Sequence, residues 1–218
     1  MSKTVHPYSH RIATIRGWKS RWFARGKKYN ELLEMDVRLR DFLTKRLRGH
    51  YVADIHFEHG VDTGKIFIHT SRPGMIIGRN GEGIDKLKKD INRFASRGGI
   101  KLPVKFEVEI AEIKSPDSNA MIVAHGIAEA LEKRMQFRRV MKMTMEKIMA
   151  SADVQGARIV LSGRLGGAEI ARREELKRGG IPMQFIRGDI DYASHRAVLP
   201  YGSIGIKVWI YLGDTLGK

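Results

Sequence analysis

The residues best suited to chemistry in this sequence are glycines and cations, and their spacing suits the binding of phosphate. Gly78-Arg79-Asn80-Gly81 lies between two segments with helical apolar spacing. A turn between helices leaves backbone N–H groups at the start of the second helix, where the helix dipole favours an anion. The glycines allow close approach of a phosphate–sugar backbone, while Arg79, Asn80 and the following Lys86 add charge or hydrogen-bonding groups. The alternative is that Gly78 and Gly81 only form a tight turn between helices.

A second group of cations is expected on one face of a later helix. Arg138 and Lys142 are one helical turn apart, and Arg139 lies three residues before Lys142, so all three share an outward face. An ordinary solvated helix face would look similar. Lys133 and Arg134 immediately upstream extend the positive field, which favours contact with phosphates.

Further cations stand among glycines and aromatic residues. The stretch GRLGGAEIARREE pairs glycines with three arginines, and the N-terminal region sets Trp18, Trp22 and Phe23 among basic residues. These aromatics either pack on their own domain or stack on RNA bases. The candidate RNA-binding cations in these two regions are Arg16, Lys19, Arg21, Arg164, Arg172 and Arg173.

No group of residues has the spacing of a catalytic or metal site, so we expect neither an enzyme nor a cofactor. Residues 60–65, GVDTGK, resemble a phosphate-binding P-loop, but three residues separate the glycines and Ile66 replaces the required Ser or Thr. A hairpin is the better interpretation. The histidine pairs with possible metal-ligand spacing are His6 with His10 and His56 with His59. Neither pair comes with a third ligand, and a zinc site needs three or four. The acidic residues Glu169, Glu174 and Glu175 stand beside arginines and are expected to form salt bridges.

Composition points to a polyanionic partner. The 218 residues carry a net charge of +16, and a domain with this imbalance repels itself unless a polyanion neutralises it. A membrane surface is the competing partner, but no apolar run approaches the roughly 20 residues that a span needs. The N-terminal sequence lacks the features of a signal peptide. The absence of cysteine weakly supports a reducing, cytoplasmic location. No small-molecule substrate is expected.

Periodicity predicts two α+β domains behind a basic, aromatic arm. The arm covers 1–29, the first domain 30–113 and the second 114–218, with two helices and a mostly antiparallel sheet. KSPDSN at 114–119 is a plausible linker with a helix cap at Asp117 or Ser118. Expected helices lie at about 31–47, 84–94, 119–134 and 137–151, and expected strands at about 51–58, 64–70, 104–110, 154–163, 182–187, 190–199 and 204–212.

IIGRNGEGI resembles the I-I-G-x-x-G-x-x-I signature of the KH domain, whose GxxG loop clamps single-stranded nucleic acid. The predicted order helix, strand, strand, short helix, loop, helix, strand resembles the type II arrangement (α-β-β-α-α-β). Apolar flanks and the element order make this match far more specific than the spacing alone. Related loops often carry lysine at a middle position, where this chain has Asn80, so we expect phosphate binding to depend on Arg79 and the backbone.

Nearly the whole chain resembles the bacterial small-subunit (30S) ribosomal protein S-three family. The motifs that carry the likeness, in the family's order and spacing, are KTVHP, the W-x-S-x-W-F-A of residues 18–24, FRRVMK, GRLGGAEIAR, GDIDYA and YGSIGIKVWIY. The resemblance implies a structural protein in the head of the small subunit that binds 16S-type rRNA. It also implies contacts with the small-subunit proteins numbered ten and fourteen.

The same resemblance implies a role for the second group of cations. The FRRVMK match places Arg138, Arg139 and Lys142 where messenger RNA enters the subunit, and links them to opening of messenger structure. One departure is Arg173, which stands where relatives often have a small hydroxyl residue. A free KH-type RNA-binding regulator and an RNA-processing enzyme are the alternatives; the enzyme would need a carboxylate cluster or metal ligands.

Overall fold

The computed structural model describes residues 5–60, 63–100, 103 and 105–215, which form two compact α+β units. One unit is Trp18–Lys114; the other combines the described part of Met1–Gly17 with that of Ser115–Lys218. The predicted fold class is confirmed. No helix in the described residues is long and apolar enough to cross a membrane.

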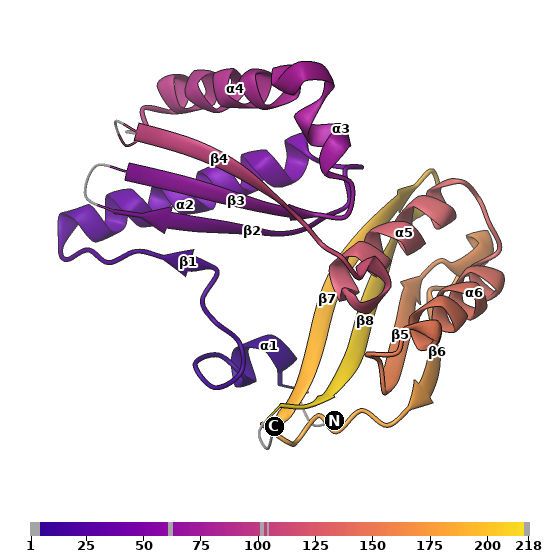
Figure 1. The fold of residues 1–218 in the computed structure, drawn as a ribbon. Helices are drawn as coiled ribbons and strands as arrows, with labels where there is room; N and C mark the ends of the chain where they lie inside the picture. Colours follow the sequence, from indigo (N-terminus) through magenta and orange to yellow (C-terminus); the bar gives the residue numbers. More distant parts are fainter. Residues whose placement is uncertain (1–4, 61–62, 101–102, 104, 216–218) are drawn as a thin grey trace. The chain divides into compact units, whose positions relative to one another are not determined.

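The first unit has the element order of a type II KH domain (Figure 1). A short β1 (Ser20–Arg21) precedes the long helix α2 (Lys27–Arg46), which leads to the hairpin of β2 (Val52–His59) and β3 (Thr63–Thr70). The predicted hairpin is therefore confirmed, although residues 61–62 at its tip lie outside the described residues. Helices α3 (Pro73–Ile77) and α4 (Glu82–Gly98) flank the turn η1 (Arg79–Gly81), and β4 (Lys105–Glu112) closes the sheet in the order β1-β2-β3-β4.

Alternation along the strands sends one row of side chains into the core of this unit. Ile55 and Phe57 of β2, Ile66 and Ile68 of β3, and Val108 of β4 join one buried cluster with side chains of α2, α3 and α4. The intervening residues, including charged and histidine side chains, form the other face of the sheet. Helix α2 begins four residues before its predicted start. Gly26, at φ +61°, is its N-cap, so the first turn of the helix precedes the apolar stripe from which the start was predicted.

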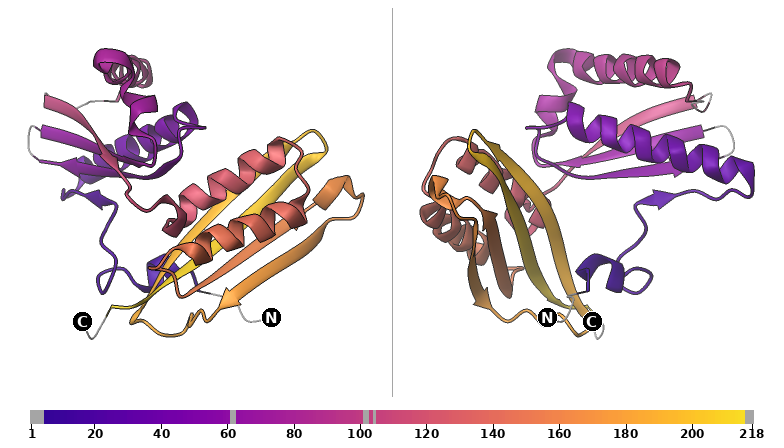
Figure 2. Two further views of the ribbon diagram at one scale, coloured as in Figure 1. Left: turned by 45° about the vertical axis from the view of Figure 1, so that its right-hand side comes forward. Right: turned by 180° about the vertical axis from the view of Figure 1, so that it is seen from behind.

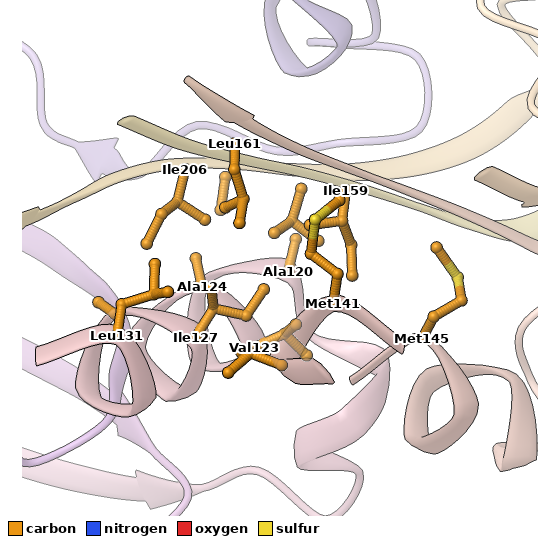
Figure 3. Close-up of a cluster of buried hydrophobic side chains, with 14 of the residues drawn as sticks. Ala120, Val123, Ala124, Ile127, Leu131, Met141, Met145, Ile159, Leu161 and Ile206 are labelled. Atoms are coloured by element: carbon orange, nitrogen blue, oxygen red, sulfur yellow. The ribbon is translucent and has the colours of Figure 1, made fainter. Parts of the chain in front are cut away.

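The second unit packs two helices on one face of a four-stranded antiparallel sheet (Figure 2). Helices α5 (Ala120–Glu132) and α6 (Phe137–Ala150) are followed by β5 (Gly156–Gly163), the turn η3 (Leu165–Gly167), β6 (Arg172–Gly179), β7 (Gly188–Leu199) and β8 (Gly202–Asp214). The strand order is β6-β5-β8-β7. Figure 3 shows the core, where Ile127 and Met145 of the helices meet Ile159 and Ile206 of the sheet.

A short turn, η2 (Pro116–Ser118), precedes α5, and the predicted cap is displaced by one or two residues. The side chain of Asn119 accepts hydrogen bonds from the backbone N–H groups of Met121 (3.1 Å) and Ile122 (3.2 Å). Asp191 Oδ2 accepts a third, from Ala120 N at 2.7 Å. The cap is therefore Asn119, because Asp117 and Ser118 are already committed to the preceding turn.

The predicted strand at 182–187 is wrong, and β6 at 172–179 was missed. Residues 182–187 form turns, with Phe185 N bonded to Pro182 O at 3.3 Å. β6 is an edge strand whose one partly buried core side chain is Leu176, so it lacks the apolar alternation that marks a strand. Charged side chains at the edge of a sheet prevent pairing with other chains.

The predicted arm over 1–29 is divided between the two units. Helix α1 (Pro7–His10) and Arg11 belong with the second unit, where the buried Arg11 donates to the carbonyls of Gly188 (2.5 Å), Phe185 (2.7 Å) and Met183 (3.3 Å). Residues from 18 onward belong with the first unit, Trp18–Lys114, which is called the KH unit below; there β1 pairs in parallel with β2. These contacts join residues far apart in sequence, which local composition does not encode.

Candidate nucleic-acid interface

The geometry of the GxxG loop explains its glycines without a ligand. Gly78 and Gly81 have φ of +71° and +82°, and Asn80 between them has φ of +51°, which asparagine tolerates better than most residues. Gly83 meets a different need, because a Cβ there would overlap the carbonyl oxygen of Ile76 and lie 2.8 Å from that of Ile77. These glycines let α3 and α4 approach each other closely, so the glycines alone do not indicate a binding site. Whether the loop can bind phosphate depends on the charged groups that it exposes.

The loop presents one cation at its tip and acids beside it. Arg79 is exposed, and no ion pair to it is found within the described residues. Glu82 and Asp85 lie in the first turn of α4, where they already offset the helix dipole, and Lys86 pairs with Glu82 at 3.8 Å. The α4 terminus is thus a weaker anion site than the sequence predicts, and Arg79 is the accessible charge. Of the two isoleucines before the loop, Ile76 is buried and anchors it, whereas Ile77 is only partly buried.

A buried carboxylate fixes the start of the KH unit and separates its aromatic residues into two kinds. Asp36 accepts hydrogen bonds from Trp22 Nε1 (3.2 Å), Arg40 (2.7 Å) and the Ser20 hydroxyl. Trp22 is therefore structural. Trp18 and Phe23 are 63% and 79% exposed and keep ring surface that could stack on bases. Packing on the chain's own domain is thus confirmed for Trp22, while stacking on RNA stays a prediction for Trp18 and Phe23.

The N-terminal cations proposed from sequence all have partners within the chain. Arg16 reaches Asp189 at 2.7 Å in a mostly buried pair, Lys19 reaches Asp54 at 3.0 Å, and Arg21 reaches Glu58 at 3.2 Å. Arg16 is thereby used to hold the N-terminal segment. Arg21 is the most exposed of the three, with 61% of its side chain open.

Two histidines of the KH sheet, His59 and His69, have pKa values lowered below that of free histidine. Burial lowers the pKa of His59, against the opposing effect of Asp36. Burial also lowers the pKa of His69, with His56 acting in the same direction and Asp54 opposing. Burial would raise the pKa of Asp54, but hydrogen bonds from His56 and Lys19 lower it overall. These histidines are therefore structural groups that favour the neutral form.

The structure brings the second group of cations together on α6. Val140, Met141, Met145 and Ile148 face the core, which leaves Arg138, Arg139 and Lys142 exposed on the opposite side. Arg138 pairs with Glu174 of β6 at 3.3 Å. Within the described part of the chain, neither Arg139 nor Lys142 forms an ion pair.

The cations of the glycine–arginine stretch are dispersed. Arg164 is half-buried and donates to the carbonyls of Ala168 (2.9 Å) and Tyr201 (3.1 Å), so it holds the loop. Arg172 lies near Glu174 (3.9 Å) on the helix side of β6, while Arg173 pairs with Glu175 (3.4 Å) on the other side. The predicted salt bridges are confirmed for Glu174 and Glu175.

Two further cations, Arg158 and Lys207, were not singled out in the sequence. Both alternate with buried residues in central strands of the second unit, and that alternation is the signal that could have found them. Within the described residues, no three histidine or acidic side chains are placed to hold a metal ion.

Comparison with known proteins gives matches to both units. Residues 38–117 match the KH domain family, and residues 127–210 match the family described as ribosomal protein S3, C-terminal domain. The small ribosomal subunit protein uS3 of Psychrobacter sp. (strain PRwf-1) is 43% identical over 216 residues, covering 99% of this chain and 84% of the relative. The uS3 protein of Burkholderia cenocepacia (strain HI2424) is 39% identical over 218 residues, covering all of this chain and 79% of the relative.

Proposed function

This chain belongs to the small ribosomal subunit protein uS3 family, and we propose that it guides messenger RNA into the small subunit. Membership makes it an RNA-binding structural component of that subunit, with a KH domain. Beyond this, we propose that it lies in the subunit head and binds 16S-type rRNA. Its exposed α6 face would contact messenger RNA at the channel where the message enters, and help to open its structure.

The exposed cations of α6 carry this proposal. Contact with an RNA backbone is most favourable for cations that solvent can reach and that no carboxylate already neutralises. Arg139 and Lys142 meet both conditions within the described residues, and Arg138 is exposed despite its pair with Glu174. Three cations on one helix face contact phosphates irrespective of base sequence, as a channel for any message requires.

Charge alone favours the duplex, whose phosphates are more closely spaced, so we propose that this face acts by holding the strand that has just been opened. Cations that hold the backbone of a strand as its base pairs open retard re-pairing, because the strand must leave them to close the duplex. Opening in this way needs no nucleotide hydrolysis by the chain itself. Translocation elsewhere on the ribosome supplies the force, and the α6 face favours the opened state.

For rRNA we propose a different set of residues. The loop residues Gly78 to Gly81 would lie against the backbone, with Arg79 and Lys86 as its cations. Arg21, Arg172 and Arg173 keep exposed side chains of 61%, 48% and 59% and remain candidates, as does Lys19. Arg16 and Arg164 would act indirectly, by holding the segments that carry the contacts. The proteins numbered ten and fourteen are proposed as neighbours.

The experiment uses small subunits reconstituted with Arg138→Ala, Arg139→Ala and Lys142→Ala together. Translation through a stable messenger hairpin is compared with translation of an unstructured message. We expect slowing at the hairpin alone, whereas Lys147→Ala, an exposed lysine in the last turn of the same helix, leaves both rates unchanged. Sedimentation of the variant with the small subunit verifies assembly. An unchanged hairpin rate in assembled subunits would exclude the messenger role.

A further inference from the structure

The sheet face opposite α5 and α6 carries a group of cations, of which only Arg173 was proposed above as an rRNA contact. Alternation puts every second residue of each strand on this face, away from the core. Paired positions of neighbouring strands bring its charged residues together. They are Lys177, Arg158, Lys207, Arg173, Arg196 and one acid, Glu175. The face is therefore strongly positive.

A groove of about 420 Å³ lies on this face beside the N-terminal segment. Val5, His6 and Pro7 line it on one side, and Arg158, Arg173, Lys207 and Trp209 are among its other lining residues. The groove belongs wholly to the second unit. Three cations and the aromatic residues Tyr192 and Trp209 make up half of its ten lining residues.

Two buried donors in this groove lack acceptors. Trp209 is 8% exposed, and its Nε1–H has no hydrogen-bond partner in the described structure; the same is true of Arg158 Nε. Buried polar groups are nearly always paired, so these two point to an acceptor that binds from outside. The Trp209 ring packs against Arg158 (5.0 Å) and Tyr192 (5.1 Å). With the ring covered, its N–H is the group left to bind a ligand, and base stacking is not favoured.

One carboxylate holds the arginines of the groove in the free chain. Glu175 Oε2 accepts from Arg158 at 2.8 Å and lies 3.4 Å from Arg173. Lys207 forms no ion pair within the described residues. Because Glu175 is partly exposed, an incoming anion can take its place between the two arginines. Arg158, whose guanidinium lies over the Trp209 ring, would then turn from Glu175 toward the anion and leave the indole accessible.

We propose that this groove binds a phosphate group of an RNA backbone, with Arg158, Arg173 and Lys207 as its cations and Trp209 as a neutral donor. The inference rests on the proposed RNA-binding function and adds a third contact surface to it. RNA fits better than an acidic protein segment because successive cation rows are about 7 Å apart along the strands, so that they face a regularly charged polymer. Neutral donors beside cations also suit the several oxygens of a phosphate.

The test measures binding of a single-stranded oligouridylate to the full chain over a range of salt concentrations. Arg173→Gln with Lys207→Gln should reduce the salt slope by about 0.7 for each phosphate that the variant no longer neutralises. Trp209→Phe should weaken binding about two- to tenfold without changing the slope, because its donor is uncharged. Glu175→Gln should act oppositely and tighten binding. Lys147→Gln, on the helix side of the same unit, is the matched control and should change nothing.

Arg79→Gln, in the GxxG loop, separates failure of the groove from failure of RNA binding. If it lowers the slope while the groove variants leave slope and affinity unchanged, the groove proposal is wrong and the proposed function stands. If neither changes RNA binding, the groove proposal and the proposed rRNA contact of the GxxG loop both fail, and the α6 proposal is left to its own test. Polyglutamate is the second probe: if the double variant loses polyglutamate binding but keeps that of RNA, the groove takes an acidic protein segment and the proposal is overturned. Thermal unfolding of Trp209→Phe verifies that the unit still folds.

Discussion

Replacing Arg139 by alanine should stabilise the protein while weakening the messenger contact proposed for α6. Arg139 lies in the first turn of α6, at the positive end of the helix dipole. That turn contains no acid, and Gln136 makes no capping hydrogen bond with its side chain. Lys142, three residues on, adds a like charge. The arginine is thus placed where local electrostatics oppose it, as expected of a residue kept for binding.

The gain follows from two contributions. Relief of the unfavourable dipole contact contributes about 0.3–1 kcal/mol. Removal of the repulsion between Arg139 and Lys142 adds about 0.2–0.5 kcal/mol. The substitution breaks no ion pair within the described residues, and alanine is at least as good a helix former as arginine. The net gain of about 0.5–1.5 kcal/mol corresponds to a rise in Tm of about 1–6 °C for a chain of this size.

Thermal unfolding by circular dichroism measures the effect, with Lys147→Ala as the control of opposite sign. Lys147 lies in the last turn of α6, where a cation is favourable, so its loss should lower stability by about 0.3–1 kcal/mol. The two variants remove the same charge from the two ends of one helix. A fall in Tm for Arg139→Ala, or shifts of the same sign in both variants, would refute the electrostatic reasoning.

Three further outcomes are expected. Gly83→Ala should destabilise the KH unit by about 1–3 kcal/mol in urea denaturation, because its Cβ would overlap the carbonyl oxygen of Ile76. Arg11→Met should cost at least about 3 kcal/mol by the same measurement, because it leaves several buried carbonyls without a charged donor. Stability of the KH unit should fall as pH is lowered from about 7 to 5, because the lowered pKa values of His59 and His69 mean that the unfolded chain binds more protons there.

Each of these has a matched control. Gly74→Ala, where a Cβ meets nothing within 4 Å, should leave stability unchanged or raise it. Arg178→Met, at an exposed position of β6, should have little effect. His59→Gln with His69→Gln should flatten the pH dependence. A parental pH profile in that double variant would mean that other groups are responsible.

Much of the KH unit was predictable because its signals are local. Gly78 and Gly81 mark a turn with positive φ, and the apolar spacing on both sides marks helices, so α3, the loop and α4 were found where they were expected. The long strands β7 and β8 likewise follow from their alternation. In contrast, β6 was missed because an edge strand needs few apolar residues, and the apolar run at 182–187 forms turns.

The sequence by itself determined the two α+β domains, the GxxG loop, the excess of positive charge and the α6 cations, because each depends on composition or on spacing along the chain. Only the tertiary structure decided which cations can bind RNA. Arg16 and Arg164 are held within the chain, by Asp189 and by the carbonyl of Tyr201. A charge is free or neutralised according to what the fold brings beside it, and Arg16 lies 173 residues from its partner.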